Sequence, residues 1–141
     1  MSVEFIDKPF ITVVINSPTY LNSLSPTEEE FEADVRELEI KLHSDQYKNN
    51  KIVLFGSSTF RDWENAKTDL SFDSLLNLGF GGSTLVSCRT YFSRIVVPNN
   101  PDKMIFYAGD NDIGSGTSAK ELLYEFVFSW NYHFCHHLFI S

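Results

Sequence analysis

Three short apolar runs, each of which ends at a glycine, constrain the fold of this 141-residue chain most strongly. The runs occupy residues 51–55, 75–78 and 104–108, and a stretch with helical character follows each of them. Short apolar runs that end abruptly at glycine are typical of buried parallel strands. Their alternation with helices predicts an α/β fold, in which helices cover both faces of a parallel sheet.

A long amphipathic helix is expected ahead of the first strand. Its start is indicated by Ser25 as a cap, Pro26 in the first turn and early acidic residues. Its remaining positions are mostly charged, which indicates a solvated outer face rather than a binding site. Its inner face is predicted from the apolar residues that recur at helical spacing, Phe31, Val35, Leu38 and Leu42.

Further helices are expected after the strands. Helical stretches are predicted over residues 57–66 and 85–91, and Ser118 is expected to cap a last helix, with Glu121 three residues later. The apolar face predicted for that last helix consists of Leu122, Leu123, Phe126, Val127 and Trp130. Residues 137–141 are expected to begin a fourth strand.

Length and composition indicate one α/β domain that follows an N-terminal arm. The 43% of hydrophobic and 21% of charged residues are ordinary for a globular protein, and the length suits a single domain. Residues 1–24 are expected to form an extended arm, and residues 25–141 the α/β domain. The β-branched run 11–15 of the arm is interpreted in two ways, as a packed N-terminal segment or as a strand that pairs with a sheet edge or another chain.

Charge and cysteine content exclude several classes of partner. The formal net charge of −8 argues against binding to nucleic acid or to anionic lipid. The N-terminal residues lack the layout of a signal peptide, and the apolar run 10–15 is too short to span a bilayer. Cys88 and Cys135 do not make a disulfide framework, so a cytoplasmic location is expected. The oligomeric state is not predicted.

Small polar segments follow all three predicted strands. They are Gly56-Ser57-Ser58, Gly79-Phe80-Gly81-Gly82-Ser83 and Gly109-Asp110-Asn111-Asp112. Because the carboxyl ends of parallel strands share one rim of the sheet, the three segments are expected to lie there together. They supply a hydroxyl at a helix N-terminus, glycine N–H groups that a ligand can approach, and a side-chain amide donor. Acyl transfer through an oxyanion needs these three parts.

Each of these residues also has an ordinary structural interpretation. A serine such as Ser58 often caps a helix, glycines often turn the chain, and Asn111 and Asp112 are typical turn or cap residues. The functional hypothesis rests on the prediction that all three segments occupy the same rim.

In order and spacing, the three segments resemble the first three sequence blocks of the SGNH hydrolases, also called GDSL-type esterases and lipases. The resemblance covers about residues 28–125 and includes Phe60-Arg61-Asp62-Trp63 after the first block and Tyr107-Ala108 before the third. It implies a flavodoxin-like three-layer α/β/α sandwich, which agrees with the strand pattern. Ser57 stands where many members have aspartate, a variation that one subgroup of the family shares.

The resemblance also implies roles for individual residues. Ser58 matches the nucleophile of the family. The backbone N–H groups of Ser58 and Gly82 and the side chain of Asn111 match its oxyanion donors. No cofactor and no metal is implied.

The base of the family does not match any part of this chain. Family members carry an aspartate three residues before a histidine in a late block, and no Asp-x-x-His occurs here. The fold is therefore expected to be incomplete at the C-terminus. Of the four histidines, His43 is expected on the surface of the charged helix. The other three, His133, His136 and His137, lie between the last helix and the end of the chain. His136 and His137 lie at the N-terminal end of the expected fourth strand and are therefore expected away from the reactive rim, and the alternative is that a histidine of this group substitutes for the base. A second alternative is zinc binding by His133 and His136 with Cys135.

These observations predict a serine ester hydrolase that acts on a small-molecule or carbohydrate ester through an acyl-enzyme at Ser58. The alternative is a non-catalytic module of the same fold that binds a carbohydrate or an anion. A third hypothesis is a phosphate cradle, as in flavin-binding proteins, formed by residues 57–59 at a helix N-terminus.

Overall fold

A three-stranded parallel sheet forms the centre of the structure, a computed structural model that describes residues 28–43 and 52–130. Its strands are β1 (Ile52–Gly56), β2 (Leu75–Gly79) and β3 (Lys103–Tyr107), in the order β2-β1-β3. In the register of the sheet, Leu54 of β1 lies between Asn77 of β2 and Ile105 of β3. The predicted parallel sheet and α/β class are confirmed.

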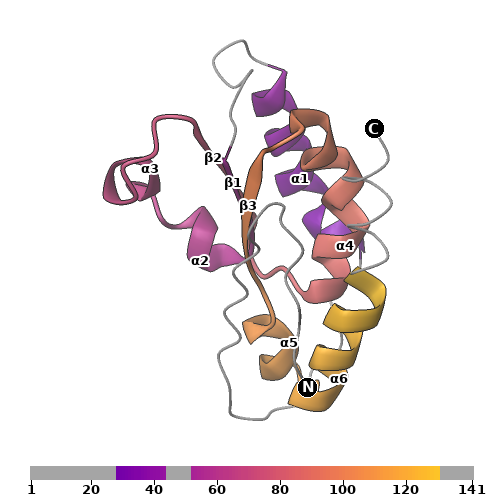
Figure 1. Cartoon of the computed structure of the whole chain (residues 1–141). Helices are drawn as coiled ribbons and strands as arrows, with labels where there is room; N and C mark the ends of the chain where they lie inside the picture. Colours follow the sequence, from indigo (N-terminus) through magenta and orange to yellow (C-terminus); the bar gives the residue numbers. More distant parts are fainter. Residues whose placement is uncertain (1–27, 44–51, 131–141) are drawn as a thin grey trace.

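The order of the strands determines which helices cover which face. The chain passes from β1 to β2 through the short helices α2 (Ser58–Arg61) and α3 (Ala66–Asp69), and then crosses back over β1 to β3 through α4 (Leu85–Ile95). Because parallel crossovers are right-handed, this reversal of direction places α4 on the opposite face of the sheet from α2 and α3. Figure 1 shows this arrangement, with α1, α4 and α6 together on one side. The order 2-1-3 is the beginning of the flavodoxin-like order 2-1-3-4-5.

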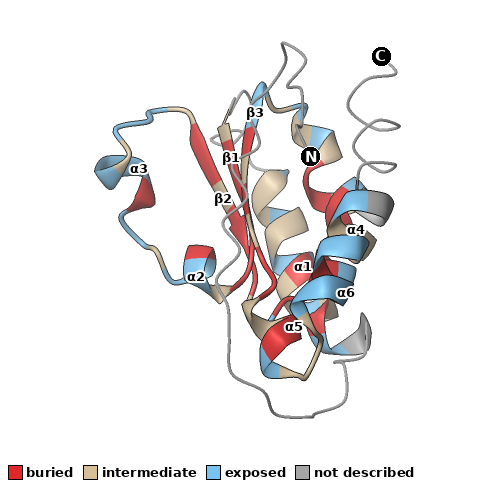
Figure 2. Cartoon of the chain, turned by 60° about the horizontal axis from the view of Figure 1, so that its bottom comes forward, coloured by how far each residue is buried: buried red, intermediate tan, exposed pale blue. Residues whose placement is uncertain are grey.

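The main hydrophobic core lies between the sheet and helices α1 and α4. Phe55 of β1 is fully buried at its centre, with ring centroids 6.2 Å from Phe80, 5.9 Å from Phe92 and 5.7 Å from Phe106. Figure 2 shows the buried residues concentrated along the strands and on the inner sides of the helices. A smaller cluster under α2 and α3 contains Leu54, Phe60, Ala66 and Leu75. Consecutive residues of β1 therefore serve opposite faces, as the pleat of a strand requires.

Helix α1 (Glu28–Leu42) is the long amphipathic helix that the sequence predicts. Phe31 and Val35 are buried in the main core, and Leu38 and Leu42 pack against it. The residues expected to cap this helix, 25–27, lie outside the described part of the chain.

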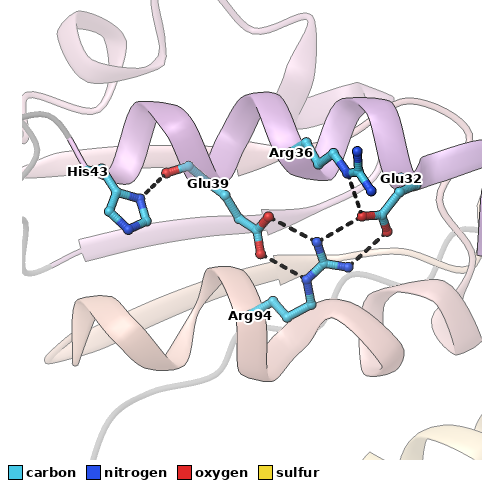
Figure 3. Close-up of polar contacts among 5 residues, drawn as sticks. All are labelled: Glu32, Arg36, Glu39, His43 and Arg94. Carbon is cyan, nitrogen blue, oxygen red and sulfur yellow. Dashed lines mark hydrogen bonds and ion pairs between the residues drawn. The ribbon is translucent and has the colours of Figure 1, made fainter.

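An arginine on α4 ties α1 to its neighbour. The guanidinium of Arg94 makes ion pairs with Glu32 and Glu39, each at 2.8 Å, and Glu32 also pairs with Arg36 at 2.9 Å (Figure 3). The hydrogen bonds from Arg94 and Arg36 lower the pKa of Glu32 to about 2. Glu32 therefore stays ionised at pH values well below its ordinary pKa of 4.5.

The helical stretch predicted over residues 57–66 is divided into two single turns, α2 and α3. Trp63 lies in the break between them, and its indole Nε1 donates to Asp69 Oδ2 at 2.7 Å. Phe60 and Ala66 are buried on either side of the break. The prediction of one continuous helix was wrong because tertiary packing and this indole contact replace the local helical bonds.

The later helices also differ in extent from the prediction. Helix α4 continues to Ile95, four residues beyond the predicted end. Helix α6 (Ala119–Tyr124) begins at the predicted cap, where Ser118 and Glu121 form a capping box, and a π-helical segment (Glu125–Trp130) follows it. Leu122 is buried and Phe126 packs against the core, whereas the side chains of Leu123 and Val127 are exposed, contrary to expectation.

Several predictions concern residues outside the described ranges 28–43 and 52–130. They are the extended arm over residues 1–24, the fourth strand over residues 137–141, and every contact of the three C-terminal histidines and Cys135. Among the helices of the described residues, none combines the length and apolar character that crossing a membrane requires.

Candidate active site

The carboxyl ends of β1, β2 and β3 lead into the three polar segments that the sequence singles out. The chain leaves β1 toward β2 on one side of the sheet and returns to β3 on the other. The ends of β1 and β3 therefore form a topological switch point, the place where open α/β sheets usually bind ligands. Contacts between the segments define the geometry of this rim.

The first segment turns sharply at Gly56. Its φ is +140°, and a Cβ added there would lie 1.8 Å from the carbonyl oxygen of Tyr107 in β3, so only glycine fits. Ser57 follows as the fully buried N-cap residue of α2, and its N–H donates to the same oxygen at 2.9 Å. Ser58 is the first residue of the helix and is partly exposed. The cap position thus belongs to Ser57, and the Ser58 side chain has no hydrogen bond to another described residue.

The hydroxyl of Ser57 connects the first segment to the third. Its Oγ donates to Oδ2 of Asp110, the first residue of the short helix α5 (Asp110–Gly114), at 3.4 Å. The other oxygen of Asp110, Oδ1, is buried and has no hydrogen-bond partner among the described residues. The contact places a carboxylate beside the residue that precedes Ser58.

The second segment is held to the first by backbone bonds. The N–H of Phe80 donates to the carbonyl oxygen of Gly56 at 3.0 Å, which continues the pairing of β2 with β1. The N–H of Gly81 then donates to Oδ2 of Asp34 on α1 at 3.3 Å. Gly82 is exposed at the tip of the turn with φ +70°, a conformation that favours glycine. Its N–H makes no hydrogen bond to another described residue.

The third segment forms hydrogen bonds with the residues on both sides of Thr84, which are Ser83 and Leu85. Asn111 Nδ2 donates to the carbonyl oxygen of Ser83 at 3.0 Å. The carboxylate of Asp112 accepts from the N–H of Leu85, the first residue of α4, at 3.0 and 3.2 Å. Asn111 and Asp112 were expected in a loop, but they lie in the first turn of α5, where helical geometry points consecutive side chains in different directions.

Burial controls the titration of two groups near the rim. Desolvation raises the pKa of Asp112 to about 6, against a smaller lowering by the bond from Leu85. Desolvation likewise raises the pKa of the Cys88 thiol, which is completely buried in α4. Cys88 is therefore a core residue and not a nucleophile.

The three candidate residues Ser58, Gly82 and Asn111 thus lie on segments that contact one another. The contacts run through their neighbours, from Ser57 to Asp110 and from Asn111 to Ser83. Two further residues hold the rim together without having been predicted from the sequence, Asp110 and Asp34. Asp110 could have been predicted, because it directly precedes Asn111 in the polar segment that follows β3.

No described residue supplies a histidine to this rim. His43 is exposed at the end of α1, and its Nδ1 lies 2.6 Å from the carbonyl oxygen of Glu39, so its predicted surface position is confirmed (Figure 3). The other three histidines lie outside the described ranges. Within those ranges, no group of three or more histidine, cysteine or acidic side chains is arranged to hold a metal ion.

Comparison with known proteins agrees with the fold. The sequence matches no family model and no curated protein. The structure is similar to a crystal structure from Bacteroides fragilis NCTC 9343, a protein described as a "putative acylhydrolase", with a TM-score of 0.52 and 21% identity. The similarity covers 78% of this chain and 53% of that one, so the chain spans about half the length of that structure. At 21% identity, this similarity shows that the two proteins share an α/β fold.

Proposed function

We propose that this chain carries the nucleophile and the oxyanion donors of a serine ester hydrolase, with Ser58 as the nucleophile. The observation that carries the proposal is the bond from Asn111 to Ser83, because it joins the amide donor to the glycine turn on the rim where Ser58 begins α2. The partly exposed Ser58 side chain, free of hydrogen bonds to described residues, supports the same assignment. The description of the structural neighbour is consistent with this class of reaction.

In the proposed reaction, Oγ of Ser58 attacks the carbonyl carbon of the ester and loses its proton to solvent, and the electron pair of the C=O bond moves to its oxygen. That oxyanion accepts hydrogen bonds from the backbone N–H groups of Ser58 and Gly82 and from Nδ2 of Asn111. A primary amide has two N–H donors, and Asn111 gives only one of them to Ser83. The C–O bond then breaks, the alcohol leaves with a proton that solvent supplies, and water hydrolyses the acyl-enzyme.

The proposal assigns no general base. No Asp-x-x-His occurs in the sequence, and the described histidine is remote from the rim. The absence of an Asp-x-x-His from the sequence supports the alternative of a non-catalytic binding module. A phosphate cradle has less support, because the carboxylate of Asp110 contacts Ser57 and would repel an anion there.

Covalent labelling tests the proposal directly. The full chain is incubated with a fluorophosphonate, with and without imidazole as an external base, and the labelled peptide is identified by mass spectrometry. We expect labelling of Ser58 that imidazole accelerates, and no labelling of that peptide in Ser58→Ala. Ser93→Ala, which removes an exposed hydroxyl on α4, is the matched control and should label normally. Labelling that is absent, or that persists unchanged in Ser58→Ala, would contradict the assignment and favour the binding module.

A further inference from the structure

A groove of about 480 Å³ runs along the outer edge of β2, the edge that pairs with no other strand of the described residues, next to the candidate site. One wall comes from α1, which contributes Asp34 and Glu37, and the other from the α2–α3 region, which contributes Arg61 and Trp63. Its size is within the range of small-ligand sites. Ser58 is not one of its lining residues, so the groove is a separate feature that adjoins the rim.

Arg61 connects the groove to the candidate site. It lies in the same helical turn as Ser58, and its guanidinium lies against the backbone of Gly81, where an added Cβ would be 1.7 Å from Nη1. Asp34, which accepts the N–H of Gly81, lines the groove as well. The turn that carries Gly82 therefore lies next to two residues that line the groove.

The backbone of β2 offers little to an added strand. The N–H groups of Leu75 and Gly79 do not pair with β1, and both already have local acceptors. Leu75 donates to the carbonyl oxygen of Phe72 at 3.2 Å, and Gly79 donates to Oδ1 of Asn77 at 3.0 Å. These two N–H groups are therefore not available to an added strand, and the N–H of Asn77, between them, is the one that faces this edge without a local acceptor among the described residues. The groove is thus better suited to a ligand that binds side chains.

The charges in the groove discriminate between classes of ligand. The described residues contribute three acidic and three basic side chains to it, Asp34, Glu37, Glu64, Lys41, Arg61 and Lys67. An acyl chain would take such groups out of water without replacing their hydrogen bonds, which is unfavourable. A phosphate would meet carboxylates as well as cations. A neutral polyol donates to the carboxylates and accepts from the cations, so it suits both.

Trp63 adds a surface that a sugar ring can use. It is partly buried in the groove, and the bond from its Nε1 to Asp69 at 2.7 Å fixes the orientation of the indole. An indole ring presents an apolar body while its polar N–H is already satisfied. We propose that this groove binds a neutral saccharide. If the proposed function is correct, this saccharide is the alcohol part of the ester presented to Ser58.

Binding is measured without catalysis, so that this inference can be separated from the proposed function. The full-length Ser58→Ala chain, labelled with ¹⁵N, is titrated with maltose, cellobiose, xylobiose and diacetylchitobiose. We expect at least one of them to shift both the Trp63 indole N–H and the Gly81 amide resonances, with a Kd on the order of millimolar. Octanoate and inorganic phosphate are expected to leave both resonances in place. The inference is overturned if no disaccharide moves them, or if octanoate or phosphate moves them more.

Exposed residues of the groove provide variants that should fold normally. Glu64→Ala and Lys67→Ala are each expected to weaken the saccharide affinity about tenfold, as expected for the loss of a ligand hydrogen bond. Lys120→Ala, at an exposed position on α6, is the matched control and should bind normally. Equal affinity in all three variants would show that the ligand lies elsewhere. If the groove binds a saccharide but Ser58 is not labelled, the hydrolase proposal is refuted and the saccharide site is supported. If Ser58 is labelled but no saccharide binds, only the saccharide site is refuted.

Discussion

Asn111 donates from Nδ2 to the carbonyl oxygen of Ser83 at 3.0 Å, across 28 positions of the sequence. The bond ties the start of α5 to the turn between β2 and α4. Next to it, Asp112 accepts the N–H of Leu85. Two consecutive residues after β3 therefore fix the position of the glycine turn that contains Gly82.

Replacing Asn111 tests its assignment as an oxyanion donor. Asn111→Ala should slow the labelling of Ser58 by about 10²-fold, the usual cost of losing one such donor. Asn99→Ala is the control, because Asn99 Nδ2 also donates to a backbone carbonyl, that of Ile95 at 2.9 Å. Both variants should lose a similar, small amount of thermal stability, and only Asn111→Ala should lose labelling. A wild-type labelling rate in Asn111→Ala would remove Asn111 from the site.

Gly56 should be intolerant of any side chain. In Gly56→Ala, the new Cβ meets the backbone of β3 at 1.8 Å while φ is +140°, so neither atom can move cheaply. We expect a loss of about 3 kcal/mol or more in the free energy of unfolding, measured by urea denaturation. Gly114→Ala adds a Cβ with nothing within 4 Å and should change stability by less than about 1 kcal/mol. Comparable stability of the two variants would show that Gly56 does not approach the Tyr107 carbonyl as closely as the structure has it.

The buried carboxyl of Asp112 should make stability depend on pH. Its pKa is about 6 in the folded protein and 3.8 ordinarily, so the folded state binds a proton more tightly than the unfolded state. The free energy of unfolding therefore falls as the pH rises from 3.8 to about 6. Asp112→Asn, which still accepts from Leu85, should remove this slope and be more stable than wild type at pH 7 by about 1 to 2 kcal/mol.

Melting temperatures of both proteins between pH 4 and pH 7 (roughly the window of this titration) provide the measurement. Asp112→Ala is the control, because it leaves the N–H of Leu85 without its acceptor and should be destabilised throughout. Identical pH profiles of wild type and Asp112→Asn would contradict the expectation.

The ion pairs of Arg94 should stabilise the packing of α1 on α4. Arg94→Met should lower the melting temperature by roughly 5 °C at low salt, because Arg94 binds two carboxylates of α1. The side chain of Arg36 is 72% exposed and pairs with only one carboxylate of the described residues, that of Glu32, so Arg36→Met should have a much smaller effect. High salt should reduce the difference between the two variants by screening. A difference that is independent of salt would assign the effect to lost packing of the arginine stem.

The same ion pairs predict a response to acid. The folded pKa of Glu32 is about 2, below the ordinary 4.5, so its contribution is fully present above pH 4.5 and is lost as the pH falls toward 2. Wild type should approach the stability of Arg94→Met across this window, as measured by thermal melts. A constant gap between the two proteins down to pH 2 would contradict this.

Much of the fold was predictable because its signals are local. The burial of Phe31 and Val35 follows from helical spacing, and the strands follow from apolar runs that stop at glycine. The capping box of Ser118 and Glu121 was predicted for the same reason. The prediction of one helix over residues 57–66 was wrong where tertiary contacts compete with local propensity, as the bond of Trp63 to Asp69 illustrates.

The sequence by itself determined the parallel α/β class, the glycine-ended strands and the three polar segments of one rim. Only the tertiary structure decided which side chains of these segments meet. Ser57 reaches Asp110 across 53 positions, and Asp112 reaches Leu85 across 27. Such contacts depend on the strand order β2-β1-β3 and on the hand of the crossovers. Local periodicity carries no information on either, because it reports only which face of an element is buried.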